Sequence, residues 1–136
     1  MNRLTLAIAA GLLLLPGALL ADETWESAIG GTIVWHDDVN DTSIFLFDRV
    51  VVEPRAQLYI PGLPSSMDAR GTYFGYWIDP EGGVCDAQLM GPDGVQSDGW
   101  GAAIVTFDRS TFPSGWTAFM GDCLDPPHYG MRADVP

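Results

Sequence analysis

Short runs of β-branched and aromatic residues, broken by glycine, proline, aspartate or asparagine, fill most of the chain after position 31. Such runs are typical of β-strands, and the residues between them are typical of turns. After position 21, no window of about eleven residues carries apolar side chains at helical spacing, and residues 22–28 would form one short helical turn at most. We therefore predict strands at residues 32–36, 43–48, 49–53, 56–60, 72–79, 84–90, 102–107 and 116–123.

The spacing of these runs predicts the fold class. Turn signals recur about every 8 to 12 residues, which is typical of a sandwich or a barrel. We expect an all-β fold, a small antiparallel β-sandwich or barrel of about seven or eight strands, built as a single domain from residues 22–136. Residues from about 124 onward include Pro126 and Pro127, and we expect them to form an irregular tail.

Aromatic residues occupy both faces of the strand predicted at residues 72–79. Tyr73 and Trp77 flank Gly75 on one face, and the other face carries Phe74, Tyr76 and Ile78. One interpretation is a central strand buried on both faces, with Gly75 at a bulge or a close contact. The other is that one face is an exposed aromatic platform for a partner or a sugar.

A second aromatic candidate lies further along the chain. Trp100 stands between Gly99 and Gly101, which offer little packing of their own, so we expect it at the surface. The candidate binding residues are therefore Tyr73, Trp77 and Trp100.

The N-terminus has the three-part pattern of a secretory signal. Arg3 precedes an apolar stretch at residues 4–15, Pro16 and Gly17 interrupt it, and the small residue Ala21 marks the expected cleavage point. An uncleaved anchor is the competing interpretation, but residues 4–21 are at the lower limit of a membrane span. We expect residues 1–21 to be removed, the domain to be periplasmic or extracellular, and no stable membrane insertion to remain afterwards.

The two cysteines agree with export. Cys85 and Cys123 are an even number in an oxidising compartment, so we expect one structural disulfide. Strand alternation places Cys85 on one face with Ala87 and Leu89, and a bridge between two inward faces follows. Neither cysteine has metal-ligand spacing to another cysteine or a histidine.

Charge excludes several classes of partner. The chain has 18 acidic residues and six arginines, no lysine, and a formal net charge of −12. Phosphate recognition needs a basic surface, so a nucleic-acid-binding protein is excluded. Docking on an anionic membrane surface is disfavoured for the same reason. An apolar content of 47% is enough for a core, so a disordered chain is also excluded.

Catalytic motifs are missing from the sequence. The nearest approach to a Gly-x-Ser-x-Gly nucleophile elbow, residues 94–99, is one residue too long. His36 is followed by Asp37, but adjacent strand residues point to opposite faces, so Asp37 is badly placed to orient it. We expect no catalytic residues and no cofactor.

A calcium site is the one metal centre that the sequence leaves open. Asp38, Asn40 and Thr42 alternate oxygen-bearing side chains, as the start of a calcium loop does. The glycine and glutamate that an EF-hand would then need are replaced by Ser43 and Arg49. We therefore expect a hairpin turn rich in Asp and Asn, and no metal.

These observations lead to one main hypothesis and two alternatives. The main one is a non-catalytic exported acidic binding module, inhibitor-like toward a cationic protein or peptide. The first alternative is a carbohydrate-binding module that stacks a glycan on Tyr73, Trp77 or Trp100. The second is a small hydrolase using His36 or a carboxylate pair. The acidity also has a simpler explanation, solubility in a saline compartment.

Overall fold

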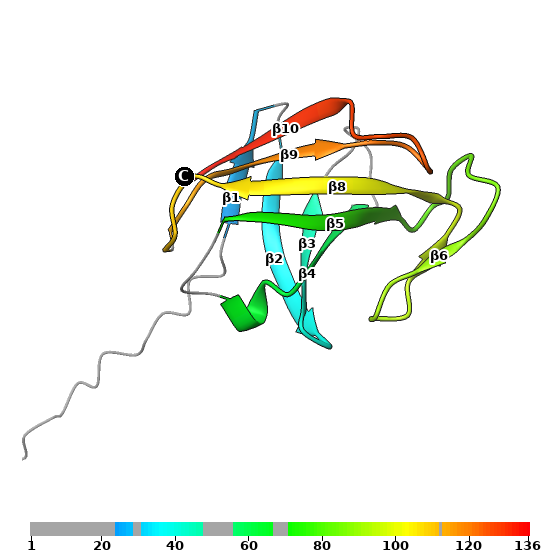
Figure 1. Cartoon of the computed structure of the whole chain (residues 1–136), viewed down its shortest axis with the longest axis horizontal. Coiled ribbons are helices and arrows are strands. Elements are labelled where there is room, and N and C mark those ends of the chain that lie inside the picture. The colour runs from blue at the N-terminus through cyan, green and yellow to red at the C-terminus, as the bar shows by residue number, and fades with distance from the viewer. Residues whose placement is uncertain (1–23, 29–30, 48–55, 67–70, 112) are drawn as a thin grey trace, which may run out of the picture.

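Eight antiparallel strands close into a barrel in the order β1-β10-β9-β8-β5-β4-β3-β2, and a two-stranded sheet, β6-β7, stands outside it (Figure 1). The computed structural model describes residues 24–28, 31–47, 56–66, 71–111 and 113–136. The elements are β1 (Thr24–Ser27), β2 (Thr32–Val39), β3 (Thr42–Phe47), β4 (Ala56–Pro61), η1 (Pro64–Ser66), β5 (Thr72–Asp79), β6 (Leu89–Met90), β7 (Gln96–Ser97), β8 (Gly99–Phe107), β9 (Trp116–Met120) and β10 (Tyr129–Asp134).

The predicted all-β fold class is confirmed. Of the two architectures that the sequence allowed, a sandwich or a barrel, the chain forms the barrel. Strand β5 has the bounds that the sequence predicts, and β4, β8 and β9 overlap their predicted segments. The expected Asp/Asn-rich hairpin joins β2 to β3 through Asn40 and Asp41, which both have positive φ. The predicted signal at residues 1–21 and the predicted strand at 49–53 lie outside the described residues.

Three local predictions are wrong. Residues 84–90 form a strand only at Leu89–Met90, because the chain from 83 to 88 runs irregularly to reach the disulfide. Residues 24–27 form a strand, β1, where the sequence predicted one short helical turn at most. The tail from 124 is not irregular throughout, because β10 pairs with both β9 and β1 and so closes the barrel.

The barrel interior is filled by aromatic and aliphatic side chains. Trp25, Phe45 and Trp116 pack in edge-on and tilted contacts with ring centroids 5.3 to 5.9 Å apart. The Trp25 indole N–H donates to the Ser114 carbonyl at 2.8 Å, which satisfies one polar group of this core. Strict alternation along β8 and β9 sends every second side chain into the interior.

A second, smaller core lies on the outer wall of the barrel. Ile44, Tyr59 and Ile78 are fully buried there, beneath partly buried side chains of the segment that carries β6 and β7. We call residues 89–98 the outer lobe. The Tyr59 ring stacks on Tyr76 at 4.9 Å, and its hydroxyl lies 2.9 Å from an Asp93 carboxylate oxygen. Burial, and then the bond to Asp93, raises the pKa of Tyr59 far above its usual value.

Replacing Tyr59 by phenylalanine is expected to loosen the outer lobe. The Tyr59→Phe change removes a hydroxyl that lies within hydrogen-bond distance of both the Gln57 amide oxygen and the Asp93 carboxylate, at a cost of about 2 kcal/mol in unfolding free energy. Urea unfolding measures the loss. Tyr76→Phe is the control, because within the described residues the Tyr76 hydroxyl makes no hydrogen bond; equal effects of the two changes would contradict this role of Asp93.

Candidate functional site: an acidic tip around the disulfide

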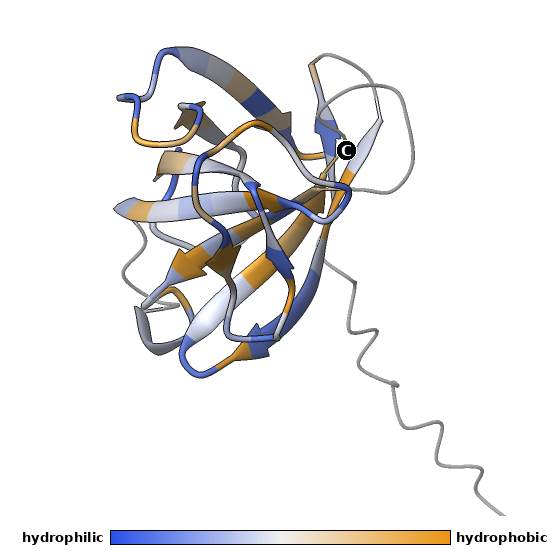
Figure 2. Ribbon diagram, turned by 90° about the vertical axis from the view of Figure 1, so that its right-hand side faces the viewer, coloured by the Kyte–Doolittle hydropathy of each residue, from blue (hydrophilic) through white to orange (hydrophobic). Residues whose placement is uncertain are grey.

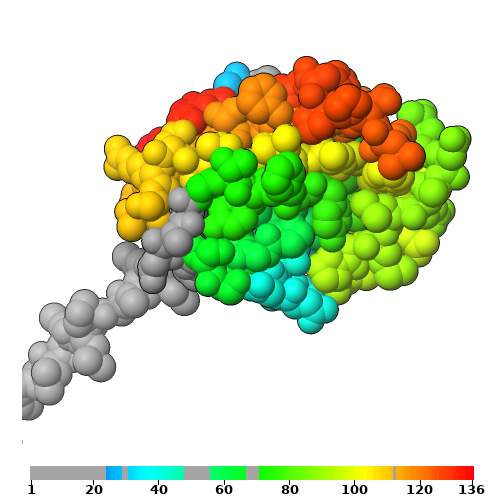
Figure 3. Space-filling view, in the orientation of Figure 1, coloured from blue at the N-terminus to red at the C-terminus, as the bar shows by residue number. Residues whose placement is uncertain are grey.

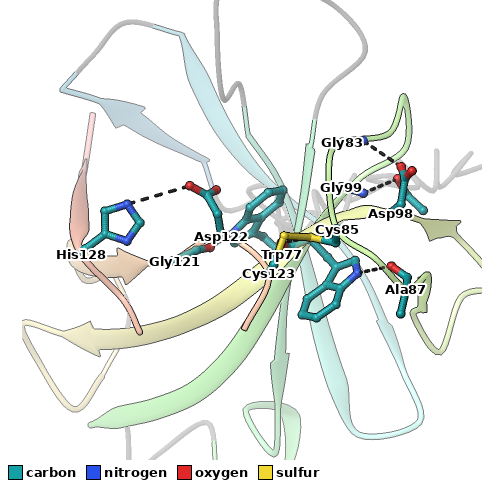
Figure 4. Close-up of a disulfide and its surroundings, with 12 residues drawn as sticks. Trp77, Gly83, Cys85, Ala87, Asp98, Gly99, Gly121, Asp122, Cys123 and His128 are labelled. Carbon is teal, nitrogen blue, oxygen red and sulfur yellow. Dashed lines mark hydrogen bonds and ion pairs between the residues drawn. A yellow bond between two sulfur atoms is a disulfide. The ribbon is translucent and has the colours of Figure 1, made fainter. Parts of the chain in front are cut away.

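Two loops meet at one end of the barrel, where the Cys85–Cys123 disulfide joins them (Figure 4). We call them together the tip: residues 80–88, which leave β5, and residues 121–128, which connect β9 to β10. The two cysteine Cα atoms are 5.4 Å apart. The predicted disulfide is confirmed, but it lies outside the barrel interior, since both cysteines are only half buried and neither lies in a strand.

The first loop is held against the beginning of β8. The Cys85 N–H donates to the Asp98 carbonyl at 2.9 Å, and the Gly83 N–H donates to the Asp98 carboxylate at 2.8 Å. A Cβ atom on Gly83 would lie 2.5 Å from the Gly99 Cα, so only glycine permits this close approach.

The second loop is fixed to the same strand from the other side. The Cys123 N–H donates to the Trp100 carbonyl at 2.8 Å, and the Gly121 carbonyl accepts the indole N–H of Trp77 at 2.8 Å. Within the loop, a turn closes through the Asp125 N–H and the Asp122 carbonyl at 2.9 Å. Both halves of the tip are therefore anchored by backbone contacts in addition to the disulfide.

Each loop presents one aliphatic side chain to solvent. Val84, directly before Cys85, is 90% exposed, and Leu124, directly after Cys123, is 91% exposed. Exposed aliphatic side chains are ordinary when scattered singly, but these two flank the same disulfide on rigidly held backbone. A partner can bury these two side chains without a large loss of conformational entropy, because the backbone that carries them is already held in place.

The tip is strongly acidic. Its two loops contain four carboxylates and no lysine or arginine: Glu81, Asp86, Asp122 and Asp125. The one basic group is His128, whose Nε2 lies 3.9 Å from an Asp122 carboxylate oxygen. Figure 2 views the molecule from the side of the tip, and the ribbon there carries both hydrophilic and hydrophobic segments. The tip therefore carries two exposed aliphatic side chains and four carboxylates on the same two loops.

The side chains of the tip suit binding better than chemistry. Neither loop contains serine, threonine or lysine, and both cysteines are oxidised, so the loops offer no hydroxyl, amine or free thiol as a nucleophile. Across the described ranges, no three His, Cys, Asp or Glu side chains gather in a way that could hold a metal ion. Asp38, from the open calcium motif, instead accepts hydrogen bonds from the Trp35 indole and the Ser43 hydroxyl.

The three aromatic residues singled out from the sequence do not form one surface. Trp77 is only 2% exposed, so its place in an exposed platform is wrong, and Tyr73 packs inside the barrel with its ring edge-on to Phe107 at 6.1 Å. Trp100 lies on the outer wall, as expected, but it is half buried against the outer-wall core, and its indole N–H donates to the Ala87 carbonyl at 2.8 Å.

His36 lies at a register shift between β2 and β3. The shift falls between Trp35 and Asp37, where a β-bulge adds one residue to β2, and His36 is exposed there. The neighbouring Asp37 accepts a hydrogen bond from the Asp38 N–H at 2.8 Å rather than from the histidine. The structure thus gives the histidine–carboxylate dyad no support.

Sequence reasoning missed the exposed apolar residues of the tip. Val84 was placed inside a predicted strand, and Leu124 at the start of the predicted tail. The signal that was present is their position beside the two cysteines, since a disulfide between loops holds its neighbours at the surface.

Among the described residues, no helix is long and apolar enough to cross a membrane.

Comparisons with protein-family models, with curated proteins and with solved structures find no match to this chain. The functional argument therefore rests on the geometry and charge of the described residues.

Proposed function

We propose that the protein is an exported, non-catalytic binding module that presents the tip to a cationic protein. The observation that carries the proposal is the pair Val84 and Leu124, each about nine-tenths exposed beside a disulfide. The bridge also supports the proposed export, because structural disulfides persist in oxidising compartments.

Charge supports the choice of partner. The chain has a formal net charge of −12, and the two loops that carry Val84 and Leu124 also contain four carboxylates and no lysine or arginine. Such a surface steers a positively charged partner toward it and disfavours acidic ones. A rigid, protruding apolar pair fits a cleft in that partner, so the role we propose is inhibitor-like: the tip occupies a functional cleft and blocks it.

Truncating the apolar pair tests this proposal. Fully burying a valine or leucine side chain is worth about 1.5–3 kcal/mol, so Val84→Ser combined with Leu124→Ser is expected to weaken binding at least about a hundredfold. The immobilised protein would be presented to cell-envelope extract, and bound proteins would be identified and quantified by mass spectrometry. One enriched basic protein is expected with the unmodified chain and not with the double variant.

Val135→Ser is the matched control for this experiment. Val135 is 44% exposed and follows β10, away from the tip, so its truncation is expected to leave capture unchanged. Capture is also expected to fall steeply between low and physiological salt, because exposed charges are screened within about 8 Å at 0.15 M. Equal capture by the double variant would remove the tip from the mechanism, and salt-insensitive capture would remove the electrostatic part.

A further inference from the structure

The outer face of β5, β8, β9 and β10 carries an apolar row that the tip does not use. Cross-strand register places Phe74 opposite Ile104, and Ile104 opposite Phe119. Phe74 is 77% exposed and Phe119 is 53% exposed, although both lie in the middle of regular strands. Figure 3 shows this side of the molecule, where β5, β8 and β9 form one continuous surface.

The row ends over a glycine. Phe119 is paired with Gly130 on β10, and its ring carbon Cε1 lies 3.5 Å from where a Cβ of Gly130 would be. The ring therefore leans over β10 instead of standing away from the sheet. Because neighbouring strands are about 4.8 Å apart, the Cα atoms of Phe74 and Phe119 are about 10 Å apart across the sheet, and the lean of the Phe119 ring toward β10 places the two rings farther apart than that.

A row of hydroxyl groups runs parallel to the apolar row. Two residues along each strand, Thr72 pairs with Thr106, and Thr106 pairs with Thr117. The hydroxyls of Thr72 and Thr106 are 3.0 Å apart, so they hydrogen-bond to each other. Each hydroxyl has one donor and two acceptor sites, so the row keeps unused capacity on the solvent side. The two rows are about 7 Å apart.

This face differs from the tip in charge. The two rows contain no carboxylate. The row of threonines ends at Arg132, which is paired with Thr117, and its guanidinium forms two hydrogen bonds with Asp108 and one with Asp134. Within the described part of these strands Arg132 is the only outward cation, and two carboxylates neutralise it, so the two rows, which carry no charge of their own, suit an uncharged ligand rather than the cationic partner of the tip.

We propose that this face binds an extended, uncharged β-linked glycan chain lying across the strands. Aromatic rings pack on the C–H faces of sugar rings, and Phe74 and Phe119 present two exposed rings on the same face of the sheet, two strands apart. Two sugars of one chain then stack on the two phenylalanines, and the chain between them crosses Ile104. The threonine hydroxyls exchange hydrogen bonds with the equatorial hydroxyls along one edge of the chain.

Calorimetric titration of the purified protein with cellohexaose and with chitohexaose tests this site. Saturable binding of at least one hexasaccharide is expected. Phe74→Ser combined with Phe119→Ser should lower the association constant at least about tenfold, since both stacking contacts are lost. Thr106→Val, which keeps the side-chain shape and removes the central hydroxyl, should lower it about threefold to tenfold.

The tip variants are the control, because Val84→Ser with Leu124→Ser should leave glycan binding unchanged. Lack of binding by both hexasaccharides would overturn the proposal, as would unchanged binding by the double phenylalanine variant. It would also be overturned if the unmodified chain sedimented as a dimer that this variant abolished, or if this variant lost capture of the basic protein. Each of these outcomes can be told apart from failure of the function proposed for the tip, because that function is tested by protein capture with the Val84→Ser/Leu124→Ser variant.

Discussion

Gly101→Ala is expected to destabilise the fold by at least about 3 kcal/mol, because the new methyl group has no space. A Cβ atom on Gly101 would lie 1.7 Å from the Gly121 carbonyl oxygen and 2.7 Å from the Trp77 indole nitrogen. The Gly121 oxygen is backbone and already accepts the Trp77 N–H, so neither contact can move without separating β8 from the chain after β9. The same separation would displace the second loop of the tip.

Urea unfolding of the Gly101→Ala protein measures this loss. The control is Gly130→Ala in β10, where a Cβ atom would meet only ordinary contacts of 3.5 Å and more. Gly130→Ala is expected to change the unfolding free energy by no more than about 0.5 kcal/mol. Similar stabilities for the two alanine proteins would show that β8 and the residues after β9 do not approach as closely as described.

Removing the disulfide is expected to cost about 2–4 kcal/mol of unfolding free energy and most of the affinity for the partner. The bridge joins residues 38 positions apart, so it restricts a long loop of the unfolded chain. In the folded protein it ties together the two loops of the tip, which otherwise depend on separate backbone hydrogen bonds to Asp98 and Trp100.

The Cys85→Ser/Cys123→Ser protein tests both effects. Its far-ultraviolet spectrum should keep the β-signature, because the pairing of β1 with β10 closes the barrel without the bridge. Its unfolding midpoint in urea should fall, and capture of the partner should fall with it. The unmodified protein treated with dithiothreitol should behave in the same way. A double variant as stable as the oxidised protein, with full capture, would remove the disulfide from both roles.

Strand prediction succeeded where local pattern and long-range pairing agree. Residues 72–79 form a strand with the predicted bounds, and alternation correctly separated Tyr73 and Trp77 from Phe74 and Tyr76. It failed for β10 (Tyr129–Asp134), where a preceding pair of prolines and an internal glycine hide a strand that exists because β9 and β1 lie on either side of it. Barrel closure depends on pairing between residues far apart in the sequence, so no short sequence window can reveal it.

The candidate site was less accessible from sequence, for the same reason. Alternation shows which residues share a face, but not which face a neighbouring strand or lobe covers. Trp77 was therefore placed on a possible platform although it lies in the barrel, and Phe74 was passed over although it is the exposed one. The pairing of Cys85 with Cys123 could be predicted by counting, whereas the exposure of Leu124 depends on the turn that follows Cys123.

Site-specific photo-cross-linking tests the central claim, that the tip is the surface which meets the partner. A photoreactive amino acid would replace Leu124 in the tip and, as a control, the exposed Ser110 in the loop between β8 and β9, at the opposite end of those strands. We expect position 124 to cross-link one basic cell-envelope protein at low salt, with a yield that falls as salt rises, and position 110 to give none. The same protein cross-linked at 110 and not at 124 would contradict the account.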